Sequence, residues 1–177
     1  MRALGRGSVS SFLKVILDVF HVVLWILLAL ATLGIVAALL LSFRPDILSS
    51  HIDIDSLNVQ GAWLGPAAAG LLVVTDLYLI GLIVVVNRLR AIFATLIAGD
   101  PFQPDNARRL RVIGGALALL ELGRYALSSA ARAMLHGAIH IGGGVSLTTW
   151  FAVLVIFVLA EVFREGARLR GEAELTI

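Results

Sequence analysis

The most regular feature of this sequence is the clustering of its apolar residues into four long blocks, which short polar segments separate. Each block approaches or exceeds the ~20 residues that an α-helix needs to cross ~30 Å of hydrocarbon. A membrane-spanning β-strand needs only about half that length, so the blocks predict helices and not a barrel. We therefore predict an all-α fold, a bundle of four transmembrane helices. Their expected bounds are approximately 15–43, 65–88, 110–136 and 146–166.

The composition agrees with a lipid environment. Of the 177 residues, 59% are hydrophobic, and the mean hydropathy is +0.97. Soluble domains are nearer about 45–50% apolar. Because the connections between the four blocks are short, we predict one compact domain over residues 1–177. The chain has no cysteine, which excludes disulfides, thiolate metal ligands and cysteine nucleophiles.

The first apolar block has two features of a secretory signal peptide. Arg2, Arg6 and Lys14 give it a basic start, and Ala29-Leu30-Ala31 resembles a cleavage site, with small side chains at its first and third positions. The apolar run nevertheless continues to Leu41, which is too long for the apolar core of a signal peptide. We therefore predict a helix that is retained in the membrane.

The positive charges predict how the chain is threaded. Cytoplasmic loops of membrane proteins carry an excess of lysine and arginine. With four spans, both termini and the middle loop share one side, and that side collects eleven of the fourteen Lys+Arg. The opposite side has Arg44 and Arg132. We therefore predict a multi-pass protein of the bacterial cytoplasmic (inner) membrane with the N- and C-termini in the cytoplasm.

The middle loop is expected to contain more helix than the membrane requires. Apolar residues repeat at helical spacing over approximately 88–98, which predicts an amphipathic cytoplasmic extension of the second helix. Gly99 is expected to end this extension, and Pro101 prevents its continuation. Asp105 or Asn106 is placed to cap the next helix.

Two stretches on this inner face resemble one known family. The first contains LIAGDPF at 96–102 and NARRLRVIG at 106–114. The second contains EVFREGARL at 161–169 and ELTI at 174–177. Together they resemble the domain-of-unknown-function family numbered 2975, which comprises small bacterial membrane proteins with four predicted spans.

The C-terminal match departs from the family pattern at two positions. The family usually has an acidic pair that leads to Asp-Leu-Thr-Ile, whereas here Gly171 interrupts the acidic run and Glu174 replaces the aspartate. The negative charge is kept. The resemblance implies a fold and a membrane location, but no established activity. It also implies a link to small helix-turn-helix regulators, whose genes neighbour those of similar proteins.

Several ionisable residues fall within the predicted spans. Asp76 and Glu121 are each about ten residues from the end of a span, so they are expected near mid-bilayer, and Arg124 and Tyr125 follow Glu121 by one helical turn. Ionised groups in hydrocarbon need partners. We predict that Asp76, Glu121, Arg124 and Tyr125 form an intramembrane polar cluster. It either locks the bundle or lines a proton, ion or ligand pathway.

Two other acidic residues lie close to the inner boundary of the membrane. Asp18 is one turn from Lys14, and Glu161 is three residues before Arg164. Both carboxylates are therefore expected to pair with a local cation and to anchor their helices.

Histidines in the outer loops raise the question of a metal site. His136 and His140 would share one face of a helix, and His51 and Asp53 would share one face of an extended segment. The chain lacks the H-E-x-x-H motif and any other zinc motif, so we expect these to be solvated loop residues. No metal and no cofactor is predicted.

No catalytic motif accompanies these features, so we predict a non-enzymatic interaction or regulatory module that acts through its cytoplasmic loop and C-terminal segment. The expected partners are the lipid bilayer and a cytoplasmic protein or a second copy of the chain. Direct nucleic-acid binding is not expected. The alternative is a small transporter, channel or ligand-binding bundle that uses the intramembrane cluster. The residues assigned to the cytoplasmic motif are Gly99, Asp100, Pro101, Phe102, Asn106, Arg109, Arg111, Arg164 and Arg168.

Overall fold

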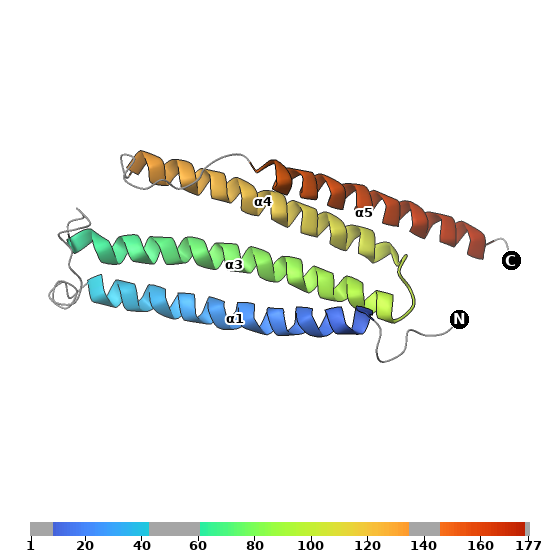
Figure 1. Cartoon of the computed structure of the whole chain (residues 1–177), viewed down its shortest axis with the longest axis horizontal. Coiled ribbons are helices and arrows are strands. Elements are labelled where there is room, and N and C mark those ends of the chain that lie inside the picture. Colours follow the sequence, from blue (N-terminus) through green and yellow to red (C-terminus); the bar gives the residue numbers. More distant parts are fainter. Residues whose placement is uncertain (1–8, 43–60, 135–145, 176–177) are drawn as a thin grey trace. The chain divides into compact units, whose positions relative to one another are not determined.

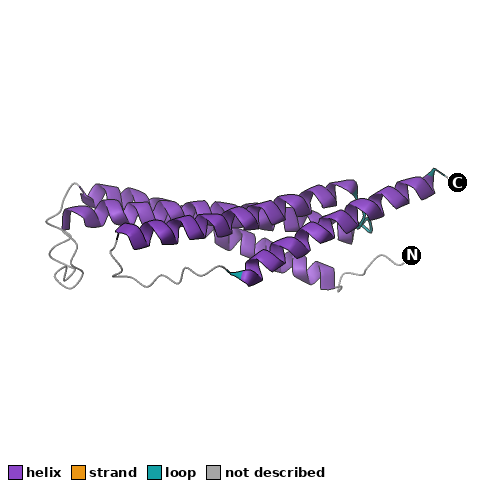
Figure 2. Ribbon diagram, turned by 90° about the horizontal axis from the view of Figure 1, so that it is seen from above, coloured by secondary structure: helices purple, strands orange, loops and turns teal. Residues whose placement is uncertain are grey.

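The computed structural model describes residues 9–42, 61–134 and 146–175 (Figure 1). Within these ranges every regular element is an α-helix, as Figure 2 shows, and the prediction of an all-α protein is confirmed. The helices are α1 (Val9–Ser42), α3 (Gly61–Ile97), α4 (Pro104–Met134) and α5 (Leu147–Glu174).

Three of these helices are long and apolar enough to cross a membrane. The qualifying segments are Phe12–Leu40 in α1, Ala68–Ile97 in α3 and Leu147–Ala173 in α5. With 31 residues, α4 is also long enough, but Glu121 and Arg124 interrupt its apolar block and lower its hydropathy. A membrane location therefore follows from α1, α3 and α5, and the fourth span stays a prediction.

The surface of α1 is apolar almost all round. Large side chains such as Leu33, Leu40 and Val19 are exposed, although the helix is among the most hydrophobic parts of the chain. A helix that is apolar on every face is buried either in a large core or in lipid. The exposed side chains of α1 therefore fit a helix that is surrounded by hydrocarbon.

The described chain forms two compact units. The first unit combines the described parts of Met1–His21 and Val84–Ile177, and the second is Val22–Ile83. In the first unit α4 and α5 run side by side in opposite directions, because Tyr125 contacts Ser146 at one end while Phe102 packs on Phe163 at the other. The candidate site lies in this first unit.

The core of the first unit joins α3, α4 and α5. Val85, Ile92 and Ile113 are buried at its centre. The partly buried residues packed against them are Leu89, Leu96, Leu110, Ala116, Leu117 and Ile156. The expected extension over 88–98 is present as an uninterrupted continuation of α3 to Ile97, and its residues Leu89, Ile92 and Leu96 form one buried face at helical spacing.

The second unit contains the remaining described parts of α1 and α3. Here α1 approaches α3 closely at Gly34, where an added Cβ would lie 3.1 Å from Leu72 Cδ1. A second contact between α1 and α3 in this unit is polar, since the Thr32 hydroxyl donates to Asp76 Oδ2 at 2.8 Å. Small residues allow transmembrane helices to approach in this way.

Candidate functional site

The turn between α3 and α4 is a glycine-dependent helix ending. Gly99 has a φ of +81°, a left-handed conformation that costs little only for glycine. The Gly99 N–H donates to Leu96 O at 3.1 Å, and the Asp100 N–H donates to Thr95 O at 3.0 Å. These two bonds satisfy carbonyls that the end of a helix leaves free. The predicted stop at Gly99 therefore has a defined physical cause.

Asn106 connects this turn to both helices. Its side chain is fully buried, and Nδ2 donates to Thr95 Oγ1 at 2.7 Å and to Pro101 O at 3.0 Å. Its Oδ1 accepts from Arg109 Nη1 at 2.8 Å, and Arg109 also donates to Ala91 O at 3.2 Å. A buried amide with both ends hydrogen-bonded fixes the geometry of the turn.

The expected cap of α4 was wrong in position. The helix begins at Pro104 and not after Asp105 or Asn106. Proline suits the first position of a helix, because its missing N–H would have no partner there and its φ already fits. Asn106 therefore lies inside the first turn, where its side chain is free to bind Thr95 across the turn.

The turn packs against α5 through one aromatic contact and one ion pair. The ring of Phe102 lies 5.7 Å from that of Phe163 between centroids, and it covers Gly166, where an added Cβ would come within 2.7 Å of Phe102 Cδ1. Asp100 forms an ion pair with Arg170. We call these five residues the α3–α5 junction. Two distant motif stretches of the sequence meet here.

A belt of charged residues crosses all four helices below the junction. Three contacts form this charged belt, and each joins two helices: Asp18 Oδ1 with Arg90 Nε at 2.6 Å, Ala91 O with Arg109 Nη1 at 3.2 Å, and Arg111 Nη2 with Glu161 Oε2 at 3.5 Å. The apolar blocks of the sequence begin or end close to these residues. Asp18 pairs with Arg90 of α3, and not with the expected Lys14, whereas Glu161 pairs with Arg164 as expected.

The last turns of α5 carry exposed ion pairs within the helix. Arg164 pairs with Glu161, and Arg168 contacts Glu165 at 2.5 Å and Glu172 at 3.8 Å. Exposed pairs of this kind contribute at most about 1 kcal/mol each. Arg164 and Arg168 therefore do not hold the fold together, and their charges are available at the surface.

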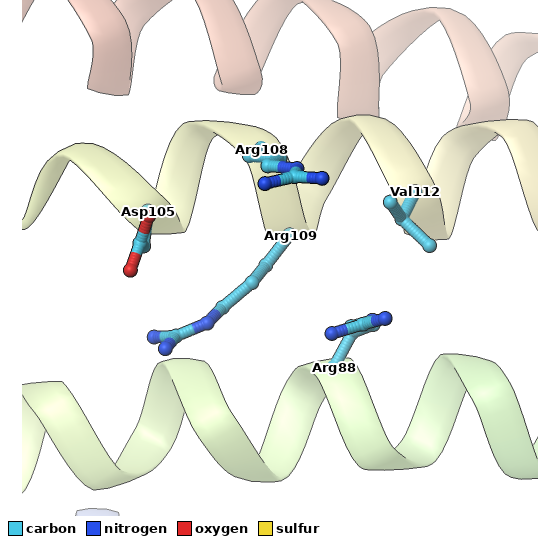
Figure 3. A pocket seen from close by; sticks show the side chains of 5 residues that line it. All are labelled: Arg88, Asp105, Arg108, Arg109 and Val112. Atoms are coloured by element: carbon cyan, nitrogen blue, oxygen red, sulfur yellow. The ribbon is translucent and has the colours of Figure 1, made fainter.

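A pocket opens between α3 and α4 at the level of the charged belt (Figure 3). It has a volume of about 270 Å³, and its lining residues are Arg88, Asp105, Arg108, Arg109 and Val112. In Figure 3 Arg88 extends from α3 towards α4, and Arg109 extends from α4 towards α3. Arg88, Asp105 and Arg108 are absent from the predicted site. A sequence-based signal for these residues does exist. Two helices that run antiparallel from a turn near residue 100 bring position 88 of α3 close to position 112 of α4.

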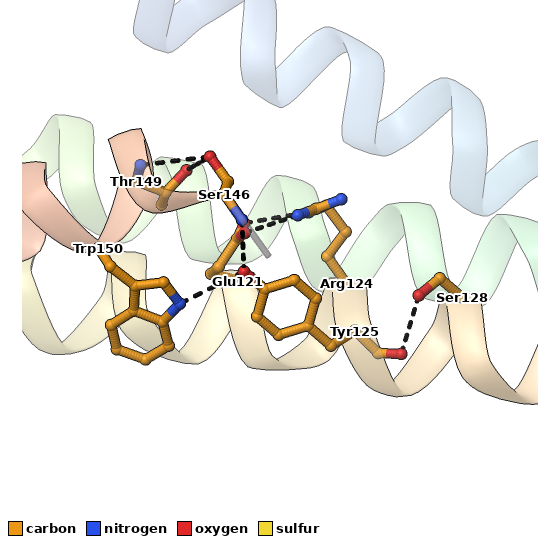
Figure 4. A network of polar contacts seen from close by, with 7 residues as sticks. All are labelled: Glu121, Arg124, Tyr125, Ser128, Ser146, Thr149 and Trp150. Carbon is orange, nitrogen blue, oxygen red and sulfur yellow. Dashed lines mark hydrogen bonds and ion pairs between the residues drawn. The ribbon is translucent and has the colours of Figure 1, made fainter. Parts of the chain in front are cut away.

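A polar network joins α4 to the start of α5 (Figure 4). Arg124 donates twice to Glu121, from Nη2 to Oε1 at 2.7 Å and from Nε to Oε2 at 3.0 Å, and its guanidinium lies over the Tyr125 ring. The Tyr125 hydroxyl accepts the Ser146 N–H at 2.9 Å and the Trp150 indole N–H at 3.3 Å. The structure therefore brings together three of the four predicted cluster residues.

The fourth residue of the predicted cluster, Asp76, belongs to the other compact unit. Its Oδ2 lies 2.8 Å from Thr32 Oγ1, while its Oδ1 is buried without a hydrogen-bond partner among the described residues. The meeting of Asp76 with Glu121 and Arg124 stays a prediction. What the structure does show is a saturated Glu121–Arg124 pair and a partly satisfied Asp76.

The residues considered for a metal site, His51, Asp53, His136 and His140, lie outside the described residues. Residues 9–42, 61–134 and 146–175 contain no group of three or more histidine or acidic side chains that could hold a metal ion.

Comparison with known proteins gives one match. No curated protein and no solved structure matches the chain. The sequence profile of a family described as "Protein of unknown function (DUF2975)" matches residues 22–177. That range contains α3, α4, α5 and most of α1, together with both stretches that resemble the family. The chain therefore belongs to the DUF2975 family.

Proposed function

We propose that the protein spans the bacterial inner membrane four times, with both termini and the α3–α4 turn in the cytoplasm. The charged belt supports this topology, since it marks one level in all four helices at which the apolar blocks begin or end. The lysine and arginine excess on that side favours the cytoplasm. α4 forms the fourth span, because pairing between Glu121 and Arg124 reduces the cost of placing them in lipid.

The protein acts by binding, and not by catalysis, at the cytoplasmic ends of its helices. The α3–α5 junction carries this proposal, because it brings together two motif stretches that are about sixty positions apart in the sequence, through the contact of Phe102 with Phe163. A turn fixed by Asn106 and Gly99 holds Phe102 in place. Such preorganisation favours binding, since little conformational freedom remains to be lost.

The chemistry of this surface favours an acidic partner. Arg164 and Arg168 are exposed and engaged only in weak pairs within α5, so a carboxylate-rich surface can compete for them. Phe102 supplies a partly exposed aromatic ring beside them. We assign this surface to a cytoplasmic protein that carries acidic groups around an apolar centre, or to a second copy of the chain.

Photocrosslinking in membranes tests the docking surface. A photoreactive amino acid at position 169, where exposed Leu169 lies next to Arg168, should capture one product of defined mass. Two differently tagged copies distinguish a second copy from another protein. Phe102→Ala removes the ring that covers Gly166, so we expect the product to be lost.

The matched control is Phe151→Ala, which removes the same side chain from an exposed apolar position of α5 near the opposite end of the helix. This variant should crosslink like the unmodified protein. A product of equal yield in Phe102→Ala, or the absence of any specific product, would contradict the proposed docking function.

A second candidate function, a small transporter or ligand-binding bundle, depends on Asp76. One of its carboxylate oxygens is buried without a partner in the described part of the chain, as in groups that bind a transported ion or ligand. Reconstituted protein with Asp76→Asn should then lose proton or cation flux, whereas Thr32→Val, which removes the neighbouring hydroxyl, should reduce it. Equal flux in liposomes with and without the protein would exclude this function.

A further inference from the structure

The pocket between α3 and α4 concentrates positive charge that the protein itself does not neutralise. Three of its five lining residues are arginines, and Asp105 is its single carboxylate. The other arginines with described side chains pair with carboxylates: Arg90, Arg111, Arg124, Arg164, Arg168 and Arg170. Arg88, Arg108 and Arg109 form no ion pair with any described residue. The arginines without an acidic partner thus gather in one place.

The donor geometry suits an oxyanion with several acceptor oxygens. Arg88 and Arg108 are exposed. Arg109 donates hydrogen bonds from Nη1 to Ala91 O and Asn106 Oδ1. Guanidinium groups bind phosphate through pairs of parallel hydrogen bonds. The first turn of α4 adds the positive end of a helix on the same side.

The position of the pocket points to a lipid as the source of the phosphate. The apolar block of α3 ends at Val86, just before Arg88, and the apolar block of α4 begins at Val112. The pocket therefore lies where hydrocarbon gives way to headgroups in the proposed topology. A phospholipid in the inner leaflet carries its phosphate at this depth.

An apolar track leads from the pocket along α4 towards the bilayer interior. Val112, Gly115, Leu119 and Leu122 follow one another at intervals of three and four residues, so they share one helix face. Leu119 is 71% exposed, Leu122 is 52% exposed, and a Cβ added at Gly115 would meet no atom within 4 Å. An acyl chain fits on this open face, whereas a free phosphate ion would not use it.

We propose that the pocket formed by Arg88, Arg108 and Arg109 binds the phosphate group of an anionic phospholipid whose acyl chain lies along the Val112–Leu122 face of α4. The proposal rests on the four-span topology but not on a protein partner. Binding here fixes the depth of the α3–α4 turn in the membrane.

Native mass spectrometry of the detergent-purified full chain tests this site. Phosphatidylglycerol should be retained in preference to phosphatidylcholine with the same acyl chains. Arg88→Gln combined with Arg108→Gln should weaken that preference by about tenfold or more, since two of the three arginines that attract the anionic headgroup are removed.

Two further variants separate loss of the site from loss of the fold. Arg168→Gln removes the same charge from α5, where Arg168 pairs with Glu165, and it should leave lipid retention unchanged. Asp105→Asn removes the carboxylate from the pocket and should strengthen retention, a change that misfolding would not produce.

Three results would overturn the proposal. The first is equal retention of phosphatidylglycerol and phosphatidylcholine. The second is a double arginine variant that keeps the preference of the unmodified protein. The third is displacement of the lipid by millimolar inorganic phosphate, which would identify a soluble anion as the ligand.

Discussion

Asn106 does more in this structure than its place in the sequence suggests. The sequence indicated a polar residue able to cap a helix, but the structure buries the side chain and uses both ends of its amide. Gly99, by contrast, could be predicted in full, because only glycine takes its left-handed conformation without strain. The two residues differ in how far along the sequence their effects reach. Gly99 acts on its own backbone, whereas Asn106 acts on Thr95, which lies across the turn.

Asn106→Ala should therefore be strongly destabilising. It leaves Thr95 Oγ1 and Pro101 O without their donor and removes one of the two acceptors of Arg109, so we expect a loss of about 2–4 kcal/mol in the free energy of unfolding. The measurement is reversible unfolding in mixed micelles. Asn87→Ala, an exposed position on α3, is the control and should change stability by less than about 0.5 kcal/mol. Equal effects of the two substitutions would refute the role of Asn106.

Glycine at position 166 is explained by space and not by backbone conformation. Gly166→Ala places a Cβ 2.7 Å from the Phe102 ring, so the ring must move and the junction should lose about 1–3 kcal/mol. Gly171→Ala meets nothing within 4 Å and should stabilise α5 by about 0.5–1 kcal/mol through helix propensity. Thermal unfolding of the two variants should therefore shift in opposite directions. Stabilisation by Gly166→Ala would contradict the observed packing.

At the scale of elements, the helices could be predicted better than their contacts. The long apolar blocks indicated α1, α3, α4 and α5, and the helical repeat indicated that α3 continues beyond Val86. The partner of Asp18 was missed because a carboxylate one turn from Lys14 looks satisfied within its own helix, while Arg90 is 72 residues away. Register between helices depends on packing and turn length, which hydrophobic periodicity does not encode.

The start of α5 is hydrogen-bonded to α4 through the hydroxyl group of Tyr125. Tyr125→Phe removes the acceptor of the Ser146 and Trp150 N–H groups, so the start of α5 should loosen at a cost of about 1–3 kcal/mol. Tryptophan emission should shift as the Trp150 environment changes. Tyr78→Phe, at a half-exposed position of α3, serves as the control and should leave the emission unchanged. An unaltered spectrum in Tyr125→Phe would show that Trp150 is held by other contacts.

At the scale of the whole molecule, the sequence predicted on which side of the membrane each segment lies. The structure adds the position along each helix at which the charged belt crosses it. The charged belt could not be read from the sequence as a belt, because its contacts join helices far apart in the chain. Its individual residues were visible only as charges at the ends of apolar blocks. The three apolar helices indicate a membrane protein. The proposed orientation of the chain across the membrane depends on the distribution of arginine.

The lack of cysteine makes this orientation directly measurable. Gln103→Cys in the α3–α4 turn should react with a membrane-impermeant maleimide in inside-out vesicles but not in intact spheroplasts. Leu33→Cys, in the middle of the apolar part of α1, should stay unlabelled from either side. Labelling of position 103 in intact spheroplasts would place the turn outside the cytoplasm and reverse the topology.

The continuation of α3 past the charged belt has one more consequence. From Arg90 to Ile97 the helix rises roughly 10 Å, which exceeds the ~5–7 Å thickness of a lipid headgroup layer. From Glu161 to Glu174, α5 rises roughly 20 Å. In the proposed four-span topology the α3–α5 junction therefore extends from the headgroup layer into the cytoplasm, since Phe163 and Arg170 lie roughly 3 Å and 14 Å beyond Glu161 along α5. A soluble protein can therefore reach the Asp100–Arg170 end of the junction without entering the bilayer.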